Sequence, residues 1–184
     1  MPDSSAPSNP SDPSIFPSLP WSLDARILRS LRTNLLADAA LRTVFPSEDQ
    51  IAILELTALL RSESIPSPPC LALSILADEE RELTSGYGAT YTTIVQLALV
   101  TSPPPRWGDT SDLLRLRIVA QLRRIIRRNA GVLTDPEGIL LTEAVTRIQR
   151  VQLDATPLPS NLLLTVINIE YRSDIDLRDQ EVLQ

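Results

Sequence analysis

The sequence predicts an α+β fold: a mostly antiparallel sheet of about four strands with two long helices packed on it. Three observations lead to this prediction. Two segments, 24–44 and 112–129, place apolar residues at helical spacing and arginines outside that stripe. Two segments rich in β-forming residues, 70–77 and 90–101, lie on either side of glycine-containing turn residues. A solitary apolar strand, 162–171, follows the second helix and leads into a charged end.

The first helix is expected to begin near Ser22 or Asp24, which are both good N-caps, and to end before Pro46. Its apolar face comprises Leu23, Ile27, Leu28, Leu31 and Leu35. The next segment, 48–61, has the spacing of a helix, although residues 51–54 could also begin a strand.

The hairpin begins with a continuous apolar strand over 70–77, which is typical of a strand buried on both faces. Cys70 lies at its start and is expected to be a packed thiol. The charged run 78–82 is expected to interrupt the strand and to form a long acidic tip with the turn that follows. A further strand is expected within 139–153.

The second long helix is predicted to begin at Asp109, Thr110 or Ser111 and to run to Asn129. Its expected buried face comprises Leu114, Ile118, Leu122 and Ile125, widened by Val119 and Ile126. Arginines lie outside this stripe, and some of them follow one another at a spacing of four residues. Three interpretations remain open for them: a solvated face, pairing with an acidic surface of a neighbouring subunit, or contact with DNA phosphates.

The chain of 184 residues is expected to divide into an N-terminal arm, residues 1–20, and a single domain, residues 21–184. The arm contains six prolines together with serines and aspartates, a composition typical of extended or disordered segments. Its candidate anchors onto a partner or onto its own domain are Ile15, Phe16, Leu19 and Trp21.

Composition argues against an enzyme. The chain has no histidine, one cysteine and five glycines. The usual general base near neutral pH is therefore missing, and neither a thiolate zinc cluster nor a phosphate-binding glycine loop can be found. We expect no catalytic, cofactor or metal site, and the sequence contains no apolar run long enough for a membrane span.

Opposite charges on the hairpin tip and on the second long helix suggest a contact between identical subunits, in which one copy's tip meets the next copy's helix. The net charge of −6 makes general nucleic-acid binding a poorer interpretation. The candidate interface residues are Asp78, Glu79, Glu80, Arg81, Glu82, Tyr87, Arg123, Arg124, Arg127 and Arg128.

The order of elements resembles the tail terminator family of long-tailed phages and phage-like tails. The matching parts are the helix 24–44, the hairpin 70–101, the helix 112–129 and the closing strand 163–171 with its Glu-Tyr-Arg ending. The arm at 1–20 is additional to the family pattern, and so is part of the segment 48–61.

The resemblance implies a virion protein, assembled in the host cytoplasm, whose copies form a ring, usually a hexamer. Such a ring caps the tail tube, ends tube growth and joins the tail to the neck. The implied partners are further copies of the chain, the tail tube protein and a neck or connector protein, with a sheath protein as a further candidate. DNA would pass through the lumen without specific binding, and no catalytic residue or cofactor is implied.

Two alternatives stay open. A neck or head–tail connector subunit would share the size and the assembly behaviour. A nucleic-acid-binding or regulatory module would instead use the arginine-rich helix, and its DNA affinity would fall as salt rises.

Overall fold

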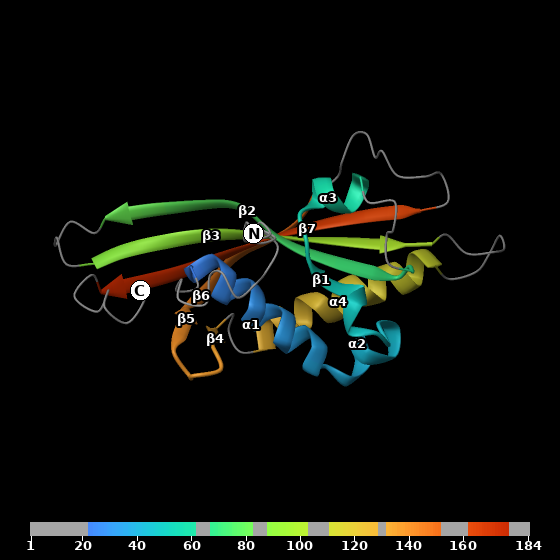
Figure 1. Cartoon of the computed structure of the whole chain (residues 1–184), viewed down its shortest axis with the longest axis horizontal. Helices are drawn as coiled ribbons and strands as arrows, with labels where there is room; N and C mark the ends of the chain where they lie inside the picture. Colours follow the sequence, from blue (N-terminus) through green and yellow to red (C-terminus); the bar gives the residue numbers. More distant parts are fainter. Residues whose placement is uncertain are drawn as a thin grey trace, which may run out of the picture.

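A five-stranded sheet forms the centre of the computed structural model, with the strand order β1-β2-β3-β7-β6 (Figure 1). The structure describes residues 22–61, 67–82, 88–102, 111–128, 132–151 and 162–176. The strands of this sheet are β1 (Ile51–Ile53), β2 (Cys70–Glu82), β3 (Gly88–Thr101), β6 (Ala144–Val151) and β7 (Leu163–Asp176). β1 is parallel to β2, and the other neighbouring pairs are antiparallel. A separate hairpin consists of β4 (Leu133–Thr134) and β5 (Leu140–Thr142).

The described residues contain four α-helices: α1 (Leu23–Ala37), α2 (Ala39–Val44), α3 (Leu56–Arg61) and α4 (Ser111–Arg128). Helices α1, α2 and α4 cover one face of the sheet, whereas α3 lies against the other face (Figure 1). The small β4–β5 hairpin packs beside α1.

The predicted α+β class is confirmed, but the sheet is mixed and has five strands rather than about four. Two short helices accompany the two long ones. Most of the difference comes from the segment 48–61, which contains a 3₁₀ turn (Glu48–Gln50), then β1, then α3. The buried side chain of Ile51 lies in the main core, so parallel pairing with β2 takes precedence over the helical spacing of this segment.

The helix predicted over 24–44 is two helices, because the chain becomes extended at Asp38. The Asp38 carboxylate accepts hydrogen bonds from the backbone N–H groups of Ala40 and Leu41, both at 3.0 Å, and so caps α2. The side-chain amide of Gln121 on α4 donates to both carboxylate oxygens at 3.1 Å. Asp38 therefore ends one helix, begins the next and joins both to α4.

We expect the substitution Asp38→Ala to lower the free energy of unfolding by about 1–2 kcal/mol, because it removes a helix cap. Urea denaturation followed by circular dichroism measures this change. Asp49→Ala is the matched control, since Asp49 is exposed and caps no helix, and it should change the free energy by less than about 0.5 kcal/mol. Equal midpoints for the two variants would contradict the capping role.

The main core lies between the sheet and the helices α1 and α4. Its fully buried residues include Ile27, Leu31, Leu35, Leu73, Leu97, Leu122, Ile167 and Tyr171. Leu114 was expected in the buried face of α4, but its side chain is exposed together with Leu113 and Leu116. Burial of α4 begins only at Ile118, so the first turns of this helix carry an exposed group of leucines.

A second, smaller core lies on the opposite face of the sheet, between α3 and the starts of β2 and β7. It contains Cys70, and burial raises the pKa of the Cys70 thiol to about 11. The thiol is therefore neutral at pH 7 and packs as a small apolar group.

Strands β2, β3 and β7 are long and extend past the start of α1 (Figure 1). β3 pairs with β7 without interruption, from Gly88 opposite Asp176 to Thr101 opposite Leu163. β2 contains a bulge between Ile75 and Ala77, where the side chain of Leu76 is 51% exposed. β1 pairs only with the first residues of β2, so no described strand covers the outer edge of β2 from 74 to 82.

Candidate subunit interface

The predicted interface residues belong to two separate surfaces. We call residues 78–82 of β2 the acidic segment, and Arg123, Arg124, Arg127 and Arg128 of α4 the arginine face. The acidic segment lies where the long strands project, whereas α4 lies under the sheet (Figure 1). The two surfaces are therefore well separated in the folded chain.

The acidic segment is a strand and not the loop that the sequence predicted, because it pairs with the β-forming residues 89–93 of β3. Asp78 and Glu79 are both exposed. Asp78 pairs with Thr93, whose hydroxyl donates a 3.1 Å hydrogen bond to Asp24 of α1, so Asp78 faces the helix layer. Glu79 faces the opposite side, since successive strand residues alternate.

The pKa of Asp24 on α1 responds to the charge of the acidic segment. Burial raises this pKa, and the nearby charge of Asp78 raises it further, although the hydrogen bond from Thr93 opposes both. The negative charge of Asp78 is therefore felt by α1, and a cation placed beside it would relieve the repulsion. Tyr87 and the side chains of Glu80, Arg81 and Glu82 lie outside the described residues.

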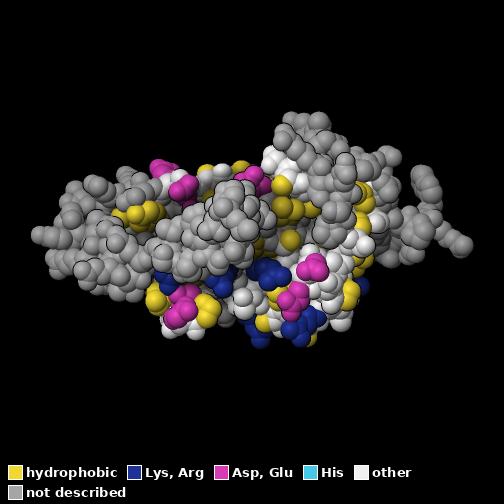
Figure 2. All heavy atoms as spheres, viewed as in Figure 1, with side chains coloured by type: hydrophobic (Ala, Val, Ile, Leu, Met, Phe, Trp, Pro, Cys, Tyr) yellow, Lys and Arg dark blue, Asp and Glu magenta, His cyan; other side chains and the backbone are white. Residues whose placement is uncertain are grey.

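The arginine face follows from the packing of α4. Ile118, Leu122 and Ile126 recur at four-residue spacing and are buried against the core, which turns the arginines outward. All four side chains of the arginine face are exposed, and none makes an ion pair or hydrogen bond with another described residue. Figure 2 shows basic side chains, with some carboxylates among them, on the part of the surface formed by the helices.

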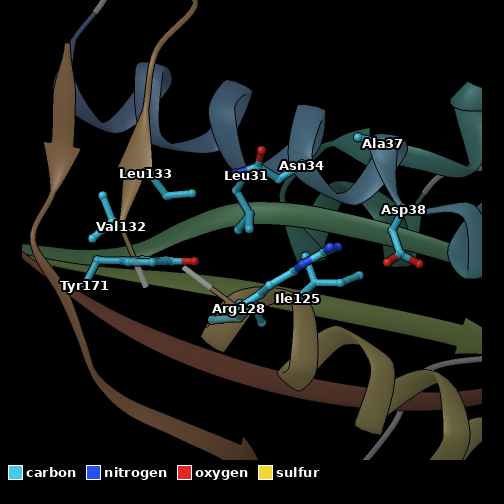
Figure 3. Close-up of a pocket in the computed structure, with 10 residues that line it drawn as sticks. Leu31, Asn34, Ala37, Asp38, Ile125, Arg128, Val132, Leu133 and Tyr171 are labelled. Atoms are coloured by element: carbon cyan, nitrogen blue, oxygen red, sulfur yellow. The ribbon is translucent and has the colours of Figure 1, made fainter. Parts of the chain in front are cut away.

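A pocket of about 320 Å³ opens beside the arginine face, between the end of α1 and the end of α4 (Figure 3). A neighbouring hollow of about 450 Å³ shares Asp38, Ile125 and Arg128 with it and adds Gln121, Arg124 and Arg127. The pocket is lined by Leu31, Asn34, Ala37, Asp38, Ile125, Ile126, Arg128, Val132, Leu133 and Tyr171. Sequence reasoning missed this pocket, because its residues come from separate elements and no spacing connects them.

Tyr171 forms one wall of the pocket. Its side chain is 1% exposed, and its hydroxyl is directed into the pocket, toward Leu31 and Arg128 (Figure 3). The hydroxyl makes no hydrogen bond with any described residue. Burial raises the pKa of Tyr171, so the phenol stays protonated and can donate a hydrogen bond.

A buried ion pair between Arg26 of α1 and Asp135 was also missed, because Asp135 appears in the sequence only as part of a turn. The Asp135 carboxylate also accepts a 2.7 Å hydrogen bond from the backbone N–H of Ile139. Burial alone would raise the pKa of Asp135, but the hydrogen bonds from Arg26 and Ile139 and the charge of Arg26 together hold it below its usual range. The pair joins α1 to the β4–β5 hairpin.

Other kinds of site were also considered. Across the described ranges, no three Asp, Glu or Cys residues gather closely enough to hold a metal ion. None of the helices in those ranges is long and apolar enough to cross a membrane. The candidate arm anchors Ile15, Phe16, Leu19 and Trp21 lie outside the described residues.

Comparison with known proteins identifies no relative: no protein-family model matches the sequence, and no curated protein matches it.

Proposed function

We propose that this protein is a structural subunit of a phage or phage-like tail, whose copies assemble into a ring that caps the tail tube. The ring would end tube growth and join the tail to the neck. The observation that carries this proposal is the outer edge of β2, where no described strand pairs with residues 74–82.

An open strand edge presents unpaired backbone N–H and C=O groups, which can pair with another chain. In β2 this edge is long and includes the exposed carboxylates of Asp78 and Glu79. Charges on an edge hinder indiscriminate pairing, so the edge favours a partner that supplies cations. The β2 edge therefore suits a specific, repeated contact.

The arginine face supplies such cations on another part of the same chain. A contact between two different surfaces of identical subunits is heterologous, and it closes into a ring when the rotation between subunits divides a full turn. The acidic segment and the arginine face thus support a head-to-tail ring, in which each copy uses both surfaces once.

Light scattering at several protein concentrations and salt concentrations tests the proposal, together with negative-stain electron microscopy. We expect a ring-sized species, formed either by the protein alone or on addition of the tail tube protein. Association should weaken as salt rises, because exposed charges are screened. A protein that stays monomeric in every condition, with and without the tube protein, would contradict the proposal.

The arginine face, which is exposed and pairs with no other residue that the structure describes, favours a second candidate, a nucleic-acid-binding module. In that case a monomer or dimer should bind duplex DNA with an affinity that falls steeply between 50 and 200 mM salt. A connector subunit, the other alternative, would form rings that bind the neck protein but leave the length of the tail tube unchanged.

A further inference from the structure

We propose that the pocket between α1 and α4 is a binding site for a carboxylate-bearing strand, namely residues 76–79 of β2 from a second copy of this chain. The inference rests on the proposed ring and adds to it the site where neighbouring subunits join.

The hydroxyl of Tyr171 gives the pocket a polar group that can bind an occupant. It opens into the pocket and makes no hydrogen bond with any described residue, so an acceptor that enters can pair with it without displacing a protein partner. This hydroxyl is directed into the pocket (Figure 3) and is protonated, so it can donate to an acceptor that enters.

The charges around the pocket indicate an anionic acceptor. Arg128 lines both hollows, and Arg124 and Arg127 line the outer one. Asp38 is the acidic residue that faces them, and its oxygens already accept hydrogen bonds from the N-terminus of α2 and from Gln121. Three arginines against one occupied carboxylate leave an excess of positive charge for a further carboxylate.

Part of the pocket wall is apolar, since Leu31, Ile125, Val132 and Leu133 line it beside the polar side chain of Asn34. The occupant should therefore carry an apolar side chain close to its carboxylate. The β2 edge has this combination, because Leu76, exposed at the bulge, lies two residues before the exposed Asp78 and Glu79. A carboxylate that enters the pocket would accept a hydrogen bond from Tyr171 and pair with Arg128, while the leucine covers the apolar part of the wall.

The occupant comes from another copy because of where the two surfaces lie. In one chain, β2 projects past the start of α1, whereas α4 lies under the sheet (Figure 1). The segment 76–79 is held by its pairing with β3, and its Asp78 lies near Asp24 at the start of α1, whereas the pocket lies at the end of α1.

A charge exchange tests this pairing through the dissociation constant measured by light scattering or sedimentation. Asp78→Arg with Glu79→Arg should weaken association at least about tenfold, and Arg124→Glu with Arg128→Glu should do the same. All four changes in one chain should restore association to within about threefold of the wild type. Arg117→Glu is the matched control, because Arg117 is an exposed arginine of the same helix that lies outside the arginine face and lines neither hollow, and it should have little effect.

The substitution Tyr171→Phe removes only the hydroxyl and leaves the ring in the core. We expect about tenfold weaker association, the loss typical of a hydrogen bond to a charged group, with an unchanged urea midpoint for the monomer. Unchanged association in this variant would show that the Tyr171 hydroxyl does not bind the neighbouring subunit.

A cross-link gives a readout that does not depend on loss of assembly. Chains with Glu79→Cys mixed with chains with Asn34→Cys should form a mixed disulfide dimer on mild oxidation, and the buried Cys70 should not compete. Rings that form without this cross-link, and without rescue by the charge exchange, would overturn the proposed role of the pocket but would not contradict the ring proposal. A wild-type protein that never associates would overturn both.

Discussion

Replacing Leu97 with alanine should lower the free energy of unfolding by about 3–4 kcal/mol, the largest loss that we expect from a single side-chain truncation. Leu97 is 0% exposed and lies on β3, the middle strand of the sheet. It is flanked by Leu73 on β2 and by Ile167 on β7, which are also fully buried. Strands on both sides hold these neighbours in place, so they cannot close over the cavity.

Urea denaturation at pH 7 measures this loss, and Leu113→Ala is the matched control. Leu113 is 57% exposed, and leucine and alanine are both good helix formers, so this variant should lose less than about 0.5 kcal/mol. A similar loss in the two variants would mean that the core is not centred on β3.

Removing the Asp135 carboxylate should have the second-largest effect. We expect Asp135→Ala to lower the free energy of unfolding by about 3 kcal/mol at pH 7, because Arg26 would stay in place without its partner. The side chains of Arg26 and Asp135 are 15% and 3% exposed, so water can compensate only part of the lost interaction. Arg172→Ala breaks a more exposed ion pair with Asp174 and should lose much less, because solvent screens that pair.

The effect of Asp135→Ala should also depend on pH. The pKa of Asp135 is lower in the folded protein than in the unfolded chain, where an aspartate has a pKa of about 3.9. The stabilisation is therefore fully present above pH 4 and is lost as the pH falls through the folded pKa. Urea titrations at pH 7 and pH 3 should show the gap between wild type and variant narrowing at the lower pH, and a constant gap would contradict this origin.

The sequence predicted that two long helical segments and three apolar strands exist, because each buries a set of apolar residues, but it did not predict the break at Asp38 or the full length of β2. Ile118, Leu122 and Ile126 show this for α4. β1 was harder to predict. A three-residue strand is too short to show an alternating pattern of apolar and polar residues, and it forms only by pairing with β2. The break at Asp38 was not predicted, because the apolar spacing continues on both sides of it.

The acidic segment was placed in a loop because aspartate and glutamate are poor strand formers. The segment is nevertheless a strand, because it pairs with residues 89–93 of β3. Those residues are already held in place by β7 and present their backbone N–H and C=O groups to β2. The pocket could not be predicted from the sequence for another reason. Tyr171 and Arg128 lie in separate elements, and only the packing of α1 and α4 on the sheet brings them together.

The bulge in β2 also bears on how the length of this chain can change over evolution. Ile75 pairs with Val95 and Ala77 pairs with Ile94, so the ladder is already continuous without Leu76. β6 repeats this arrangement beside Thr146, because Val145 pairs with Tyr171 and Arg147 pairs with Glu170. Loss of one residue at either bulge would leave the β3–β7 pairing untouched, and the edge strands are thus the part of the sheet where single-residue deletions do least damage.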